Sequence, residues 1–183
     1  MANPGSYQQH TQTPMTFDDW VPASGAEQAF ELFKDLASIP SWSMLLCYGK
    51  AGCGKTHLCE ALVRELKWQG RYTRVYTWSD IVLYMKETMH SEFSGSYEAR
   101  LHNFKTAERL IIDDVGSGTM TTPWEWGLFE DIISHRYREG LLTVITTNLD
   151  LKDLPERVVS RFRDKEVARI CWNKAGDYRP RKV

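Results

Sequence analysis

Apolar residues recur along the chain in two alternating patterns, and their order predicts the class of fold. Stretches with helical spacing alternate with short apolar runs that are bounded by turn residues. The short runs predict five strands, at residues 44–48, 72–78, 109–115, 141–147 and 166–172. Around them, helices are predicted at residues 26–39, 56–68, 79–89, 97–106, 123–138 and 155–163. This alternation indicates an α/β fold with a mostly parallel five-stranded sheet that is flanked by helices on both faces.

Local signals place the starts of two of these helices. Thr122-Pro123-Trp124-Glu125 is a capping box with proline at the first helical position, and Gly140 is expected to end that helix. Ser79 or Asp80 is predicted to cap the helix at 79–89, because their side chains can accept from free backbone N–H groups.

The length and composition restrict what the protein can be. Residues 1–16 are expected to form a flexible N-terminal tail, and residues 17–183 a single folded domain. No apolar run approaches the roughly 20 residues that span a bilayer, and the N-terminus has no signal pattern. We therefore expect a cytoplasmic protein with no membrane partner. The four cysteines lack a Cys-x-x-Cys spacing, which argues for free thiols rather than zinc.

Residues 49–56 carry the most specific motif, Gly-Lys-Ala-Gly-Cys-Gly-Lys-Thr, between a predicted strand and a predicted helix. Glycines let the backbone wrap around phosphate oxygens, and the helix adds the positive end of its dipole. Lys55 is expected to reach the β- and γ-phosphates, and the Thr56 hydroxyl to bind Mg²⁺. The pattern predicts a phosphate loop that binds ATP, with a chance glycine turn as the alternative.

The strand at 109–115 ends in two acids. Parallel sheets bind ligands at the carboxyl edge of their strands, so both acids are expected near the glycine loop. Asp113 is the candidate Mg²⁺ ligand, and Asp114 would orient or deprotonate the attacking water. Taken alone, an Asp-Asp turn after a strand is an ordinary structural feature.

Two further polar positions follow. Asn148 ends the strand at 141–147 and could hold the attacking water, although asparagine is also a common turn residue. Arg157 and Arg161 share a helix face, which is either a solvated basic surface or the source of an arginine finger that reaches a neighbouring subunit.

Taken together, these motifs resemble those of the AAA+ ATPases. The similarity is greatest to the bacterial replicative-helicase loaders of the DnaC/DnaI type and to their relatives IstB and DnaA. The motifs that carry it are Thr16-Phe17-Asp18-Asp19-Trp20, Gly54-Lys55-Thr56-His57-Leu58, Asp113-Asp114-Val115-Gly116, Thr146-Thr147-Asn148, Ser160-Arg161 and Asp177-Tyr178-Arg179.

The resemblance implies a role for each matching position. Asp113 and Asp114 would be the Walker B pair, Asn148 the sensor 1 residue and Arg161 the arginine finger. Arg179 would occupy the sensor 2 position. The nucleotide would be bound by Gly49, Lys50, Ala51, Gly52, Cys53, Gly54, Lys55, Thr56 and His57. Only 22 residues follow Arg161, so the helical lid domain of AAA+ proteins is expected to be missing or vestigial.

The resemblance also implies a function. It indicates a slow ATPase that acts in DNA replication as a helicase loader, with a replicative helicase and single-stranded DNA as partners and an ATP-dependent homo-oligomer as the active form. An IstB-type transposition ATPase that binds duplex DNA and a small-molecule P-loop kinase are the alternatives.

DNA binding would need a local basic patch, because the net charge of the chain is −1. The segment at 79–106 resembles an extra helical element of the initiators and loaders. Its candidate contacts are Lys86, Arg100, His102 and Lys105, with a solvated surface of mixed charge as the alternative.

Overall fold

A single parallel sheet organises the protein. The computed structural model describes residues 15–21, 23–89, 95–116 and 122–178. The sheet has the strand order β2-β3-β4-β1-β5, and every pairing is parallel. The five-stranded parallel sheet predicted from the sequence is thereby confirmed. The strands are β1 (Met44–Tyr48), β2 (Arg74–Thr77), β3 (Arg109–Val115), β4 (Leu142–Thr147) and β5 (Ala168–Trp172).

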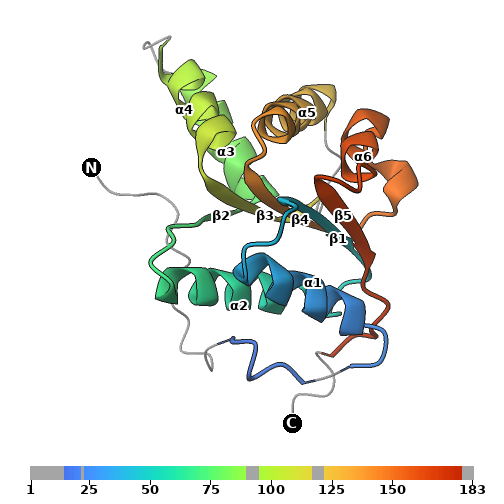
Figure 1. Cartoon of the computed structure of the whole chain (residues 1–183). Coiled ribbons are helices and arrows are strands. Elements are labelled where there is room, and N and C mark those ends of the chain that lie inside the picture. The colour runs from blue at the N-terminus through green and yellow to red at the C-terminus, as the bar shows by residue number, and fades with distance from the viewer. Residues whose placement is uncertain (1–14, 22, 90–94, 117–121, 179–183) are drawn as a thin grey trace.

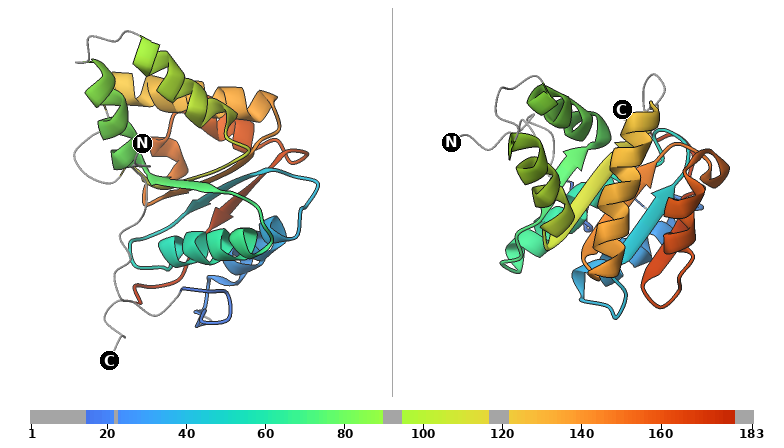
Figure 2. Two further views of the ribbon diagram at one scale, coloured as in Figure 1. Left: turned by 90° about the vertical axis from the view of Figure 1, so that its left-hand side faces the viewer. Right: turned by 90° about the horizontal axis from the view of Figure 1, so that it is seen from above.

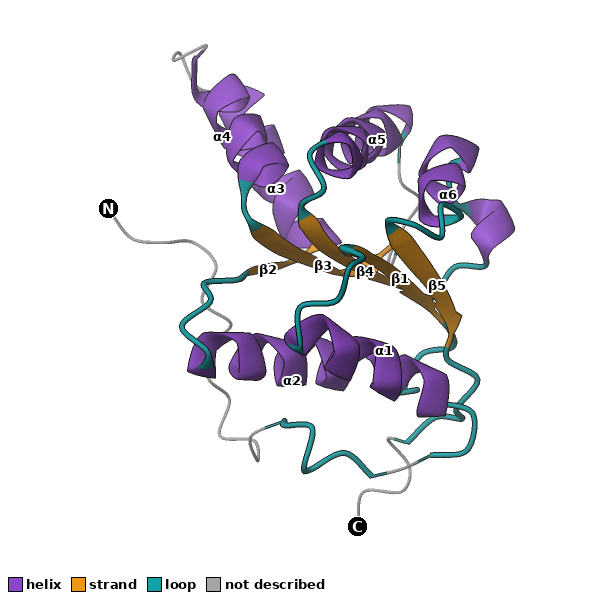
Figure 3. Ribbon diagram, in the orientation of Figure 1, coloured by secondary structure: helices purple, strands orange, loops and turns teal. Residues whose placement is uncertain are grey.

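Helices cover both faces of the sheet (Figures 1 and 3). On one face lie α1 (Glu27–Ala37) and α2 (Lys55–Trp68). The other face carries α3 (Trp78–Met89), α4 (Gly95–Thr106), α5 (Pro123–Arg138) and α6 (Glu156–Phe162), as the turned views also show (Figure 2). None of the helices among the described residues is long and apolar enough to cross a membrane. A short 3-10 turn at Leu151–Asp153 was not predicted.

The three central strands, β1, β3 and β4, are almost completely buried because each contributes to two cores. Leu45 and Cys47 of β1 pack toward α1 and α2. Met44 and Leu46 of the same strand pack toward α3 to α6. Successive side chains of a strand point to opposite faces, so covering both faces produces the continuous apolar runs seen in the sequence.

One predicted helix start is confirmed and another is wrong. The Thr122 hydroxyl accepts from Glu125 N at 3.3 Å, and the Glu125 carboxylate accepts from Thr122 N at 2.8 Å, which completes the capping box. Helix α3, however, begins at Trp78 immediately after β2. Its first turn is capped by Thr77, whose hydroxyl accepts from Asp80 N at 3.1 Å, so neither Ser79 nor Asp80 is the cap. The strand leads into the helix without a loop, as the predicted ranges 72–78 and 79–89 also imply, but the helix begins one residue earlier than predicted.

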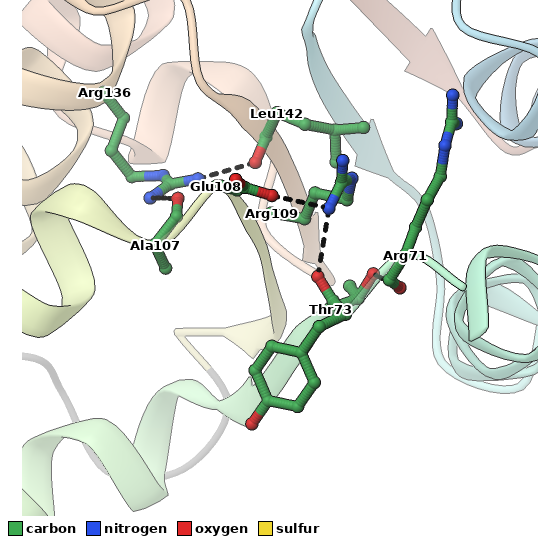
Figure 4. Close-up of polar contacts among 8 residues, drawn as sticks. Arg71, Thr73, Ala107, Glu108, Arg109, Arg136 and Leu142 are labelled. Carbon is green, nitrogen blue, oxygen red and sulfur yellow. Dashed lines mark hydrogen bonds and ion pairs between the residues drawn. The ribbon is translucent and has the colours of Figure 1, made fainter. Parts of the chain in front are cut away.

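A buried arginine joins the elements at the amino edge of the sheet (Figure 4). The guanidinium of Arg136, on α5, donates to the carbonyls of Ala107 at 2.7 Å and Leu142 at 2.6 Å. It also donates to Phe104 O and to the Thr143 hydroxyl. Burial lowers the pKa of Arg136 to about 9, so the group is still charged at neutral pH. Arg136 therefore fixes α5 against α4, the connection from α4 to β3, and the start of β4.

Candidate functional site

Three strand ends meet at the carboxyl edge of the sheet. Strand β4 lies between β1 and β3, and Thr147 at its end is in register with both Tyr48 and Val115. The loop after β1, the acids of β3 and the asparagine after β4 are consequently neighbours. The sheet topology brings together the motifs that the sequence places roughly 60 and 90 residues from the loop.

The structure shows why the loop after β1 has glycine at positions 54 and 49. Gly54 has φ +92°, and a Cβ there would lie 2.5 Å from the ring of Trp20. At Gly49, a Cβ would collide with the carbonyl oxygen of Asn173. The Asn173 side chain holds the loop in turn, since its Nδ2 donates to Cys53 O at 2.9 Å. The loop is thus packed between the N-terminal segment and the chain after β5.

Lys55 is the first residue of α2 and is buried. Its ammonium donates to Gly49 O at 2.8 Å, Lys50 O at 2.9 Å and Asn148 Oδ1 at 2.7 Å. A lysine charge at a helix N-terminus within a glycine loop is a favourable site for an anion. The contact with Asn148 links the loop directly to the end of β4.

Asp113 lies beneath the loop and is 3% exposed. Its carboxylate accepts from the hydroxyls of Thr56, at 2.9 Å, and Thr146. The Cys59 thiol lies 3.8 Å away, and burial, followed by the Asp113 charge, raises the pKa of that thiol, which keeps it a donor. The Thr56 hydroxyl and the Asp113 carboxylate are hard oxygen ligands of the kind that Mg²⁺ takes alongside phosphate and water. This donor set fits the ion predicted from the sequence.

Asp114 has an unusual backbone. Its φ is +60°, and the pairing of β3 with β4 is irregular at this point. The N–H of Asp114 donates to Thr146 Oγ1 at 3.0 Å, and the Asn148 amide donates to its carboxylate at 2.8 Å. A non-glycine residue with positive φ is uncommon, and such strain is concentrated at functional sites. The irregularity separates the side chain of Asp114 from the buried position of Asp113.

Three residues that organise this edge had no assigned role in the sequence analysis. Thr146 holds both acids of β3, Asn173 holds the glycine loop, and Trp20 packs on Gly54. The available signal for Thr146 was a hydroxyl in a strand predicted to be buried, and for Asn173 it was a polar residue directly after such a strand. Both are at most 1% exposed, and buried polar groups require partners.

The remaining candidates do not join this cluster. The imidazole Nε2 of His57 lies 2.8 Å from Thr16 O, and its ring meets that of Trp20 edge-on. Arg161 donates to Arg157 O within α6, and no contact to the glycine loop, Asp113 or Asn148 is recorded for it in the described part of the chain. Arg179 lies outside the described residues.

Three of the four candidate DNA contacts are occupied within the fold. Lys86 pairs with Glu125 at 2.8 Å, and Lys105 pairs with Asp131 at 2.7 Å. Arg100 lies over the ring of Tyr84, 3.8 Å from its centroid. These contacts favour the alternative of a surface of mixed charge for the α3–α4 segment. His102 is exposed.

Comparison with known proteins identifies the family. Residues 15–169 match the family described as IstB-like ATP binding protein. The chain belongs to this family. The replicative helicase loader DnaC of Escherichia coli (strain K12) is similar, with 32% identity over 120 residues, which are 63% of this chain and 48% of that protein. The chain spans about half the length of the curated relatives it matches first.

Solved structures show the same fold for this IstB-like chain. A crystal structure of the DnaC helicase loader has a TM-score of 0.73 and 23% identity, covering 87% of this chain and 97% of that one. Domain III of the Thermotoga maritima replication initiation protein DnaA has a TM-score of 0.77 and 21% identity, and the match covers 93% of this chain and 71% of that one. The AAA+ P-loop fold and the family resemblance inferred from the sequence motifs are confirmed.

Proposed function

We propose that the chain binds ATP together with Mg²⁺ at the carboxyl edge of its sheet and hydrolyses it. The observation that carries this proposal is the hydrogen-bonded series from Lys55 through Asn148 to Asp114. It connects a phosphate-binding loop to a carboxylate that can accept a proton. The family, described as ATP binding, supports the choice of nucleotide.

Each residue of the site has a separate task in this proposal. The loop N–H groups and Lys55 bind the phosphates. Thr56 and Asp113 hold Mg²⁺, which supplies positive charge that stabilises the transferring phosphoryl group. Asp114 accepts a proton from the attacking water, and Asn148 keeps that carboxylate and the water aligned. Asn148 contacts both Lys55 and Asp114. When phosphate binds to Lys55, the position of the Asn148 amide, and with it that of the Asp114 carboxylate, can therefore change.

Substitution of Asp114 by asparagine tests the chemical step. Asp114→Asn keeps the size of the side chain but cannot accept the proton, so ATP should still bind while phosphate release stops. Asp35→Asn, an exposed acid on α1, is the matched control and should behave as the wild type. Turnover by Asp114→Asn within about twofold of the wild type would place the base elsewhere.

The cellular role proposed for this ATPase is that of a replicative-helicase loader acting on a helicase and single-stranded DNA. The similarity to DnaC supports it. The immobilised chain is expected to retain the host replicative helicase when ATP is present. With ADP in place of ATP, the helicase should no longer be retained. The family description favours a second candidate, an IstB-type ATPase that acts on duplex DNA. Stimulation of phosphate release by duplex but not by single-stranded DNA would favour that candidate, and phosphate transfer to a nucleoside would indicate a kinase.

The proposed active form is an ATP-dependent homo-oligomer. Arg161 has no recorded contact with the site of its own chain among the described residues, and an arginine on α6 could instead reach the γ-phosphate bound by a neighbour. Arginine fingers contribute about 10³–10⁵ in rate where they have been measured. An isolated chain should therefore turn over slowly.

A further inference from the structure

A second surface, at the amino edge of the sheet, has the composition of a ligand-binding patch. Helix α2 runs from the phosphate loop to this edge and leads through a turn into β2. Residues 64–74, which we call the α2–β2 patch, read Arg-Glu-Leu-Lys-Trp-Gln-Gly-Arg-Tyr-Thr-Arg. Four basic residues and one acid give this segment a formal net charge of +3, in a chain whose net charge is −1.

Two aromatic side chains of the patch are unusually exposed. Trp68 is 85% exposed and Tyr72 is 66% exposed. By contrast, the exposed Trp172 stacks on Tyr48 and lies under Lys174. Neither Trp68 nor Tyr72 has a ring contact with another described residue. Large aromatic groups left in water without packing partners indicate an interaction site rather than a structural role.

The backbone under these rings is held in place. Arg109 donates to Tyr72 O at 3.3 Å and pairs with Glu108, as the view around Arg109 and Thr73 shows (Figure 4). The N–H of Arg71 donates to Leu66 O at 2.8 Å, which closes the end of α2. A fixed turn presents its side chains without a further ordering cost, and such preorganisation favours binding.

The cationic groups lie beside the rings. Arg64, Lys67 and Trp68 are three and four residues apart on α2, so they share one exposed face of the helix. Lys67 has no ion pair with any described residue, whereas Lys86 and Lys105 of the α3–α4 segment each pair with an acid. The α2–β2 patch therefore offers both charge and aromatic faces to a ligand.

We propose that the α2–β2 patch binds single-stranded nucleic acid. Bases stack on Trp68 and Tyr72, and phosphates contact Arg64 and Lys67. The combination of a basic surface with exposed rings is the one that single strands use, because every base has a face that can stack. In a duplex the faces of the bases are stacked inside the helix and cannot reach Trp68 or Tyr72. An acidic peptide would pair with the basic side chains of the patch but would not need its aromatic rings. The patch is distinct from the phosphate loop, so this binding does not depend on the proposed hydrolysis.

Fluorescence anisotropy of a labelled oligothymidylate, without nucleotide, tests the stacking. Trp68→Ala should weaken binding about 5- to 150-fold, the range for loss of one stacked base. Trp68→Phe should lose much less, because it keeps a ring. Trp172→Ala, the matched control, should bind as the wild type. Trp68→Ala should leave the urea midpoint and the ATP affinity unchanged, because this exposed ring has no ring contact with a described residue to lose, and that result excludes unfolding as the cause of weaker binding.

Salt dependence tests the phosphate contacts. The slope of log K against log salt is negative. In the double variant Arg64→Gln, Lys67→Gln its magnitude should decrease by about 1.4, at about 0.7 for each contact with a single strand. Lys165→Gln, an exposed lysine outside the patch, should leave the slope unchanged. An oligouridylate arm shows whether DNA or RNA is preferred, and either preference supports the proposal.

Three results would overturn it. One is equal loss of binding in Trp68→Ala and Trp172→Ala. Another is binding of a duplex as tightly as a single strand without dependence on Trp68. The third is binding of polyglutamate, but not of either oligonucleotide, in a manner abolished by the Arg64 and Lys67 changes, which would indicate an acidic protein partner.

Discussion

Thr146→Val separates the stability of the sheet from the chemistry at its edge. The hydroxyl of Thr146 donates to the Asp113 carboxylate and accepts from Asp114 N at 3.0 Å. A hydrogen bond to a charged group contributes about 1.5–3 kcal/mol and a neutral one about 0.5–1.5 kcal/mol. Valine has the same shape, so the variant should lose about 2–4 kcal/mol of unfolding free energy. With a urea m value of about 2 kcal/mol/M, the midpoint should fall by about 1–2 M.

The same strand provides a matched control. Thr143 is equally buried, accepts from the Arg136 guanidinium at 2.8 Å and donates to Leu141 O at 2.9 Å. Thr143→Val should therefore lose a similar amount of stability, but at the opposite end of β4. Below the unfolding range, phosphate release by Thr146→Val should fall about 10- to 100-fold, because both acids lose their positioning contact, while that of Thr143→Val should not.

Two outcomes of this comparison would refute the reasoning. Equal ATP turnover in the two variants would show that Thr146 does not position the acids. An unchanged urea midpoint in both would show that the hydroxyls do not make the hydrogen bonds described.

Two other predictions concern arginines. Arg136→Met should cost about 2–6 kcal/mol in urea unfolding, at about 1–3 kcal/mol for each of the two buried carbonyls that it leaves without a donor. The exposed Arg138→Met should change the midpoint little, and equal midpoints in the two variants would contradict this account. Arg161→Ala and Lys55→Ala should each lack ATP turnover alone and regain some when mixed, because a mixed interface joins an intact loop to an intact arginine. If chains that demonstrably co-assemble recover no turnover at any ratio, the finger is not supplied between subunits.

The sequence predicts most of the secondary structure because each strand and helix has its own local pattern. Strands β1 and β3 have the predicted bounds, and the capping box of α5 is read from four consecutive residues. The cap of α3 was misplaced because the apolar pattern alone does not show at which residue a strand ends when a helix follows it directly. Thr77 serves as the last residue of the strand and as the cap.

The polar contacts of the site could be predicted only in part. The acids and Asn148 follow strands, so the carboxyl edge of a parallel sheet brings them to the loop. Contacts such as Asn173 with Cys53 join residues 120 positions apart and depend on which strands are neighbours. Which strands and helices are neighbours also determines whether a basic residue has an acidic partner. The sequence does not show that Lys86 has an acid partner on α5 or that Lys67 has none among the described residues.

ATP affinity of the Lys55→Ala variant tests the nucleotide site most directly. Isothermal titration with ATP and Mg²⁺ should show binding by the wild type and by Lys34→Ala, an exposed lysine on α1, with no binding by Lys55→Ala. Circular dichroism should show that all three proteins are folded. An affinity of Lys55→Ala within about twofold of the wild type, equivalent to ~0.4 kcal/mol, would contradict the assignment of the glycine loop to phosphate binding.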